Sequence, residues 1–210
     1  MTRSNSDKNF ILGIDVGTSG CKVLLADRAG AVRASAVETY PLAQPRPGWT
    51  EQEPRSWWEA CCAACRRVLD TGVCGGADIA AVGLTGQMHS LVALDEAIEP
   101  IRPAILWNDQ RTTEQCREIQ ELAGGLDGLL GYTNNMMLTG YTGGKLLWLR
   151  EHEPENFRRL QAVLMPKDYL RYRLTGVLMT DVSDASGTGL FDVRQRRWAA
   201  ELLEKLALPE

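Results

Sequence analysis

Apolar and polar residues alternate along the first forty positions in the manner of short β-strands. Three such segments, at residues 10–15, 21–27 and 31–40, are separated by turns of only a few residues. Strands joined by short turns pair antiparallel with little loss of loop entropy. The pattern therefore predicts an antiparallel three-stranded meander at the start of the fold.

The spacing of apolar residues changes to three and four after residue 54. The residues that then fall on one face of a helix are Trp57, Trp58, Cys61, Cys62, Cys65, Val68 and Leu69. Pro54 stands where a helix tolerates proline, in its first turn. We expect this helix to bury its apolar face and to end before a glycine at residue 72.

Short apolar segments alternate with helical patterns through the rest of the chain. We expect strands at 79–85, 91–94, 104–107 and 162–165, and helices at about 112–122, 144–152, 166–174 and 199–206. Residues 123–142 are rich in glycine, and we expect an irregular excursion or lid there. This order of elements predicts an α/β fold with a mixed, partly parallel sheet flanked by helices.

The composition narrows the class of protein. The 210 residues include 44% hydrophobic and 24% charged residues, as in globular domains, and they suffice for one large α/β domain or two small ones. The net charge of −4 argues against nucleic-acid or acidic-membrane partners, and no apolar run is long enough to span a bilayer. Residues 1–9 are polar, which predicts a disordered extension rather than a signal peptide, so we expect a cytoplasmic protein.

The six cysteines agree with a cytoplasmic location, where thiols stay reduced. Cys62 and Cys65 form a C-x-x-C spacing, but no second pair follows and both histidines are distant in sequence. We expect these cysteines to pack in the core of their helix rather than to bind a metal or react.

The first candidate for chemistry is the turn between the first two strands, where the sequence reads Gly-Ile-Asp-Val-Gly-Thr-Ser-Gly-Cys-Lys from residue 13. Glycines such as Gly17 let a ligand approach the backbone, and successive turn amides can face an anion. Thr18 and Ser19 add hydroxyls, and Lys22 adds positive charge. The turn is a candidate phosphate and nucleotide site, although a plain hairpin turn is the alternative.

Asp15 ends the first strand and is a hard oxygen ligand suited to Mg²⁺, directly or through water. The pattern differs from both common phosphate loops. The spacing to Lys22 does not match Gly-x-x-x-x-Gly-Lys-Ser/Thr, and the apolar residues that follow predict a strand rather than the helix of a dinucleotide fold.

Two polar clusters follow apolar strands, where α/β folds gather functional groups. Gln87, Met88 and His89 follow the strand at 79–85 and offer donors and acceptors for a polyol or keto sugar. A histidine with a merely local hydrogen bond is the alternative.

The second cluster holds Trp107, Asp109 and Arg111. Trp107 could cover a sugar carbon chain or belong to the core. Asp109 is a candidate for sugar binding, yet an ion pair with Arg111 that fixes the loop is the commoner arrangement. The aromatic and acidic loop at 47–54 could wall the same pocket, but we favour a role in positioning the helix that follows.

The strand-turn-strand phosphate loop resembles the first phosphate motif of the sugar kinase, actin and heat-shock chaperone ATPase superfamily, which implies a ribonuclease H-like fold. The whole set of motifs resembles the N-terminal domain of the FGGY carbohydrate kinases, and within them the xylulokinases most. The resemblance is carried by the segments at 13–22, 49–54, 86–89, 103–109, 166–170 and 183–188.

This resemblance implies that ATP and Mg²⁺ are used to phosphorylate D-xylulose. It places Asp15 at the metal, Gly17, Thr18, Ser19 and Lys22 near the phosphate, and Gln87, Met88, His89, Trp107 and Asp109 near the sugar. The family's catalytic aspartate lies in a Gly-Gly-Gly-Asp-like segment that would follow Glu210. We therefore expect residues 10–210 to be a truncated substrate-side domain with no catalytic residue of its own, whose partner is the missing ATP-binding domain.

Several alternatives stay open. The substrate could be another ketose, such as ribulose, or gluconate. The chain could be a non-catalytic sugar-binding module, and an actin-like polymerising protein is disfavoured by the sugar loop. FGGY kinases are often dimers, so the resemblance also allows a homodimer.

Overall fold

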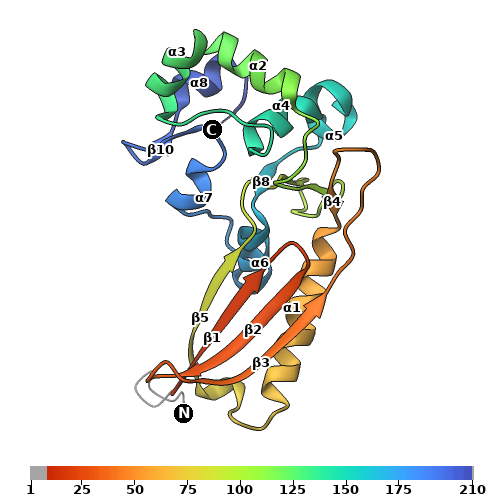
Figure 1. Ribbon diagram of the computed structural model, residues 1–210, viewed down its shortest axis with the longest axis vertical. Coiled ribbons are helices and arrows are strands. Elements are labelled where there is room, and N and C mark those ends of the chain that lie inside the picture. Colours follow the sequence, from red (N-terminus) through yellow and green to blue (C-terminus); the bar gives the residue numbers. More distant parts are fainter. Residues whose placement is uncertain (1–8, 210) are drawn as a thin grey trace.

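The computed structural model describes residues 9–209 and shows a sheet at one end of an elongated molecule and a group of helices at the other (Figure 1). The sheet contains β1 (Phe10–Val16), β2 (Gly20–Asp27), β3 (Val32–Thr39) and β5 (Ile79–Gly86), in the order β3-β2-β1-β5. β1, β2 and β3 form the predicted antiparallel meander, and β5 pairs parallel with β1. The prediction of a mixed sheet in an α/β fold is confirmed.

One face of the sheet is covered and the other is open. Leu12, Ile14 and Val16 of β1 point into the core against α1 (Pro54–Leu69) and α6 (Pro166–Thr175). On the other face, Ile11 of β1 and Val37 of β3 are 44% and 50% exposed. Because side chains alternate along a strand, the remaining residues of β1 face the open side.

The α1 helix is built as its sequence pattern predicts. It starts at Pro54, and Trp57, Cys61 and Val68 are buried along one face. Cys65 packs against the same core, and it is a free thiol. Cys62 is only partly buried and packs in neither core, so the core-packing expectation is met for Cys61 and Cys65 but not for Cys62.

A second core lies among α2 (Thr113–Leu122), α3 (Gly125–Thr133), α4 (Thr142–His152) and α8 (Ala200–Lys205). Ile119, Leu129, Leu147 and Leu202 are completely buried in it. Short elements complete the fold: β4 (Glu51–Gln52), η2 (Gly76–Asp78), β6 (Val92–Leu94), β7 (Ala104–Ile105), α5 (Pro154–Arg158), β8 (Ala162–Leu164), α7 (Val182–Ser186), β9 (Phe191–Asp192) and β10 (Arg197–Trp198).

The expectation of an irregular lid at 123–142 is wrong for its first half, because α3 is a helix. Gly124 and Gly125 take left-handed conformations at its start, with φ of 89° and 87°. Glycine has a low intrinsic helix propensity, which favoured a loop on sequence grounds. The complete burial of Leu129 in the second core outweighs that preference.

Two further points concern the chain ends and the membrane. The predicted disordered extension at 1–9 lies, apart from Asn9, outside the described residues. None of the helices between residues 9 and 209 has the length and apolar character needed to cross a bilayer, and the longest, α1, has 16 residues.

The two strand glycines Gly20 and Gly83 provide a matched test of the packing. A Cβ on Gly20 would lie 2.6 Å from the carbonyl oxygen of Glu38 on β3, whereas a Cβ on Gly83 would meet nothing within 4 Å. We expect Gly20→Ala to lower the free energy of unfolding by about 1–3 kcal/mol because the strands must separate locally. Gly83→Ala should change it by less than about 0.5 kcal/mol. Urea unfolding followed by tryptophan fluorescence measures both, and equal losses would contradict the register described here.

Candidate functional site

The turn between β1 and β2 spans residues 17–20 and is closed by a hydrogen bond of 3.1 Å from the Gly17 amide to the Gly20 carbonyl. The amides of Thr18 and Ser19, at its tip, donate no hydrogen bond to another described residue. Two free amides beside two hydroxyl groups form a set of donors that suits an anion. The geometry is therefore compatible with the predicted phosphate site.

The direction of these amides follows from the carbonyls of the same peptide groups. The Gly17 carbonyl accepts a hydrogen bond from the Tyr40 hydroxyl, and the Thr18 carbonyl accepts one of 2.7 Å from the Gln52 amide. No peptide bond in the described chain is cis. In a trans peptide the N–H points away from the C=O, so the next two amides, of Thr18 and Ser19, must point outward.

Gln52 is the centre of this support, although the sequence pattern offered it only as part of a loop that positions α1. Its side chain is 2% exposed. Its amide nitrogen also donates to the Pro41 carbonyl at 3.2 Å. Its oxygen accepts from Trp57 Nε1 and from Gln87 Nε2, both at 3.1 Å. All donors and acceptors of this buried amide are thus engaged between the turn, α1 and the loop after β5.

Asp15, Lys22 and Thr85 form a polar row across three strands on the open face of the sheet. Lys22 and Thr85 are the register partners of Asp15 on β2 and β5. Directly opposed residues share a face, and all three are exposed. The Asp15 carboxylate has no hydrogen bond or ion pair with another described residue. A free carboxylate beside the turn fits an Mg²⁺ ligand, directly or through water.

The loop after β7 meets the turn through Trp107. Trp107 Nε1 donates a hydrogen bond of 3.0 Å to the Thr18 hydroxyl, across 89 positions in sequence. The ring of Trp107 is 44% exposed and Met88 is 52% exposed. The structure therefore brings the predicted phosphate turn and both predicted sugar loops together on one open surface.

Gln87 lies beneath this surface rather than on it. It is 8% exposed, and its backbone amide continues the β1–β5 pairing with a hydrogen bond to the Val16 carbonyl. Its side-chain amide donates to Gln52 and, at 3.4 Å, to the Gly17 carbonyl. Gln87 therefore braces the turn.

His89 is partly buried, and its ring has a defined orientation. Nδ1 lies 2.8 Å from the carbonyl oxygen of Gly187, and the ring packs against Tyr141 at 4.5 Å between centroids, with the ring planes tilted by 30°. A carbonyl only accepts, so Nδ1 carries the proton and Nε2 of the neutral ring is an acceptor. Burial lowers the pKa of His89, as does the positive charge of Lys145, against the opposing effect of the Gly187 hydrogen bond. The ring is therefore neutral at pH 7.

Asp109 is placed away from the open surface. It is completely buried, and it accepts from the Thr50 amide at 2.7 Å and from the Arg111 guanidinium at 2.7 and 2.9 Å. The Arg111 guanidinium contacts the rings of Trp49 and Trp148, at 3.8 and 4.7 Å from their centroids. The arrangement favours the loop-fixing role over direct sugar contact.

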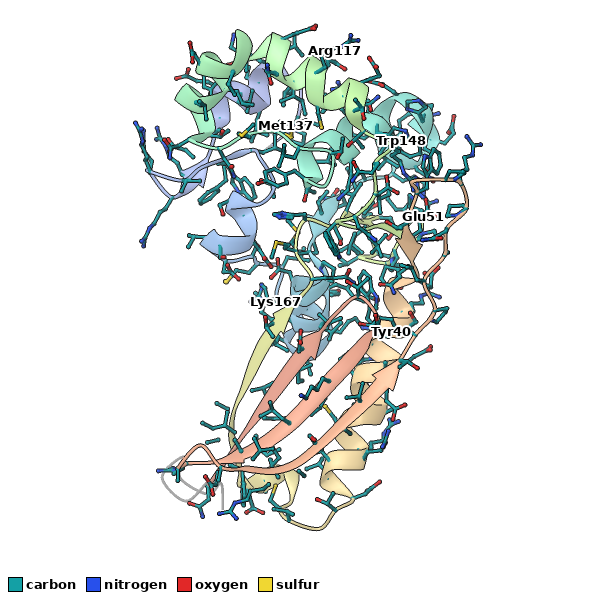
Figure 2. All side chains as sticks on the ribbon, in the orientation of Figure 1. Tyr40, Glu51, Arg117, Met137, Trp148 and Lys167 are labelled. Carbon is teal, nitrogen blue, oxygen red and sulfur yellow. The ribbon has the colours of Figure 1, made fainter. Side chains whose placement is uncertain are left out.

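Figure 2 shows Trp148 beside Glu51 at the junction between the sheet and the helices. Glu51 lies 2.8 Å from Arg111 and also pairs with Arg102, which in turn pairs with Glu153. These ion pairs join β4 to the helical part. Largely buried ion pairs therefore stabilise the junction from which the Trp107 loop extends.

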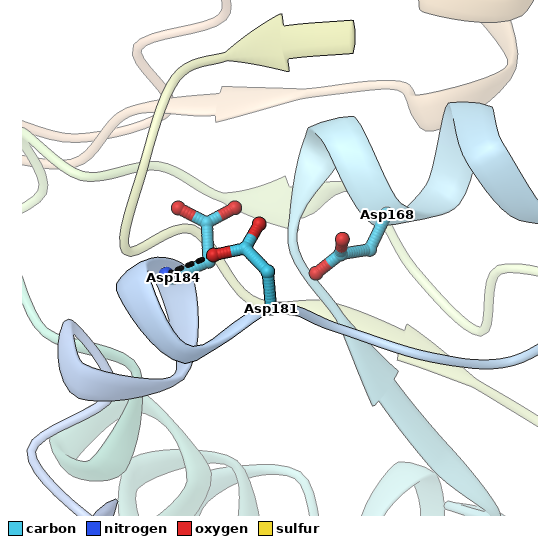
Figure 3. Close-up of side chains that lie close together, drawn as sticks. All are labelled: Asp168, Asp181 and Asp184. Carbon is cyan, nitrogen blue, oxygen red and sulfur yellow. Dashed lines mark hydrogen bonds between the residues drawn. The ribbon is translucent and has the colours of Figure 1, made fainter. Parts of the chain in front are cut away.

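A group of three carboxylates lies close to the end of the sheet (Figure 3). Ligand atoms of Asp168, Asp181 and Asp184 lie within 4.8 Å of one another. Lys167 Nζ lies 2.5, 2.8 and 3.2 Å from these three side chains in that order. Asp181 also caps α7 by accepting from two backbone amides. Lys167 pairs with all three carboxylates and so joins α6 to the start of α7, in keeping with the structural turns expected here.

A cavity of about 730 Å³ lies elsewhere, between α3 and the β9–β10 hairpin, and is lined by Tyr132, Arg196 and Trp198 among others. None of the predicted site residues borders it. The candidate site at the end of the sheet is therefore separate from this cavity.

Comparisons with known proteins show the family of this chain. The family model described as the FGGY family of carbohydrate kinases, N-terminal domain, matches residues 10–210. A xylulose kinase from Staphylococcus xylosus is 41% identical over 197 residues, covering 94% of this chain and 40% of the relative. The chain thus spans about 40% of the length of the curated relatives that it matches.

Solved structures show the same fold. A xyloylose kinase from Brucella ovis has a TM-score of 0.90 at 39% identity, over 96% of this chain and 42% of that one. A gluconate kinase from Lactobacillus acidophilus has a TM-score of 0.87 at 32% identity, over 95% of this chain and 40% of that one. The predicted sugar kinase fold of the actin type is confirmed.

Removing the support of the turn tests the site's architecture. Gln52→Leu leaves the Trp57 N–H and the Thr18 and Pro41 carbonyls without this partner. We expect the free energy of unfolding to fall by about 2–4 kcal/mol. The matched control is Gln44→Leu, on the exposed part of the same loop, which should shift urea unfolding by less than about 0.5 kcal/mol. Similar effects of the two changes would show that Gln52 does not support the turn.

Proposed function

The chain belongs to the FGGY family of carbohydrate kinases, and from this premise we propose that it supplies the sugar side of an ATP-dependent kinase that converts D-xylulose to D-xylulose 5-phosphate. The single observation that carries the proposal is the hydrogen bond between Trp107 and Thr18, which joins a sugar loop to a phosphate turn. Curated relatives called xylulose kinase, at about 40% identity, support the choice of sugar.

Phosphoryl transfer depends on positioning and on stabilisation of negative charge. The outward amides of Thr18 and Ser19 would bind the phosphate oxygens of ATP, and Lys22 adds positive charge on the same face. Asp15 would hold Mg²⁺ in place beside them. The bound metal would neutralise the charge on the phosphate oxygens. The chain's own part is to fix the phosphate at the end of β1.

The sugar would lie over the exposed Met88 and Trp107 side chains, whose apolar surfaces suit a carbon chain. His89 Nε2, an acceptor in the neutral ring, would accept a hydrogen bond from a sugar hydroxyl. Gln87 would support the turn, and Asp109 would support the loop that contains Thr50. Neither side chain would contact the sugar directly. This division narrows the predicted sugar contacts to three side chains.

The attacking hydroxyl must lose a proton. Asp109 and Asp168 are buried and paired with Arg111 and Lys167, so neither is placed to accept it. We propose that an aspartate from the part of the longer kinases that this chain does not cover acts as the base. ATP binding also requires that part.

A substrate panel tests the proposal. In a coupled assay with ATP, the longest product of the gene that contains residues 1–210 should show its highest kcat/KM with D-xylulose, above D-ribulose and D-gluconate. The 210-residue chain alone should show no turnover. Preference for gluconate would overturn the choice of D-xylulose as substrate but not the assignment as a kinase. This outcome is relevant because a gluconate kinase is among the similar solved structures. Transfer to none of the three would overturn the kinase proposal.

The metal role of Asp15 makes a separate prediction. Asp15→Asn in the same kinase should lower kcat by about 100-fold or more and raise the Mg²⁺ concentration needed for half-maximal rate, because a carboxylate ligand is lost. Asp70→Asn, at the exposed end of α1, is the matched control and should leave both values unchanged. An unaltered Mg²⁺ dependence in Asp15→Asn would rule out this metal role.

A further inference from the structure

We propose that Lys145 is a positioning residue for the sugar, because it holds the backbone on both sides of the His89 ring. This inference rests on the proposed function, in which His89 contacts the substrate. Lys145 lies in the first turns of α4 and is completely buried. Its Nζ donates to the His89 carbonyl at 2.7 Å and to the Gly140 carbonyl at 2.5 Å.

The first contact fixes an unfavourable backbone. His89 has a φ of 61°, in the left-handed region that residues with a Cβ rarely adopt. Such a conformation persists only where the surroundings hold it, and it is commonest at functional sites. The His89 carbonyl is held by two donors, Lys145 Nζ and the Thr142 hydroxyl at 3.1 Å. Both donors come from the start of α4.

The second contact fixes the neighbour of the ring. Gly140 immediately precedes Tyr141, whose ring packs against His89. A Cβ at Gly140 would lie 2.5 Å from the Trp107 carbonyl, so this backbone also packs against the other sugar loop. Lys145 therefore sets the spacing between the His89 backbone and the aromatic ring beside its imidazole.

The third support of the ring also comes from the α4 start. The Gly143 amide donates a hydrogen bond of 2.9 Å to the Thr188 carbonyl. The adjacent Gly187 carbonyl accepts the hydrogen bond from His89 Nδ1. His89 is thus held at its backbone carbonyl by Lys145, at the face of its ring by Tyr141, and at Nδ1 by the Gly187 carbonyl. Only Nε2 is left for a ligand.

Lys145 is a costly residue for this place, which argues for a role other than stability. Burial lowers its pKa to about 7, against the favourable charge of Asp109 and Cys116 and together with the repulsion of Arg111. Burying a charge costs free energy, and a neutral donor of the same reach would satisfy the same two carbonyls. The fold alone therefore does not require an ammonium group here.

Lys145→Met, of similar length and without a donor, tests the inference in the 210-residue chain. The chain contains two histidines, so two-dimensional ¹⁵N spectra resolve both rings, and His152→Gln assigns them. In the wild type His89 should show the Nδ1–H tautomer. In K145M the tautomers should mix, and the affinity for D-xylulose measured by calorimetry should fall by at least about tenfold. The melting temperature should also fall, because the Gly140 carbonyl loses its donor. Lys205→Met, an exposed lysine at the end of α8, should change none of these.

The outcomes separate the two proposals. Wild-type binding of D-xylulose with equal binding by K145M would overturn the positioning role and leave the proposed function intact. No binding by the wild type would count against the proposed function, and the tautomer would then decide the role of Lys145. Lys145→Gln, one atom shorter and unable to span both carbonyls, covers the case in which K145M does not fold. It should show the same losses at smaller size, and unchanged values there would also overturn the inference.

Discussion

The arrangement of the site depends on carbonyl groups that are held inward. The Gly17 and Thr18 carbonyls accept hydrogen bonds from Tyr40 and Gln52, and peptide planarity then turns the next amides outward. Anion binding by a turn is usually attributed to its glycines. In this molecule the glycines allow the turn, but buried donors on β4 and at the end of β3 decide which way it faces. The phosphate site is therefore a property of the core as much as of the loop.

The same constraint accounts for the distance in sequence between the parts of the site. Gln52 connects the turn to α1 through Trp57 and to the sugar loop through Gln87. A buried amide with every donor and acceptor engaged tolerates little displacement, because each lost bond leaves an unsatisfied polar atom in the core. The turn, the helix and the sugar loop are thus fixed relative to one another before any ligand binds.

Much of the fold could be predicted because most elements bury one face, and the period of burial is visible in the sequence. The meander and α1 are of this kind. The α3 helix was missed because its glycines lower helix propensity, while the burial of Leu129 that stabilises it depends on tertiary contacts. In the site, the turn and the residues after β5 and β7 could be located because they follow apolar strands. Gln52 and Lys145 could not be assigned, since their roles depend on which carbonyls come within reach after folding.

Lys145 and Gln52 show the same physical solution at two places. Each is a buried polar side chain that bridges two backbone carbonyls, and in each case the bridged backbone carries a group that faces the open surface. A neutral amide suffices at the turn, where Tyr40 and Gln87 also donate hydrogen bonds to the backbone. At His89 the backbone is left-handed, and below its pKa of about 7 the Lys145 ammonium gives stronger hydrogen bonds than a neutral donor. Burying an ammonium group costs free energy. We attribute its presence here to the left-handed backbone of His89, which needs a stronger donor than the turn does.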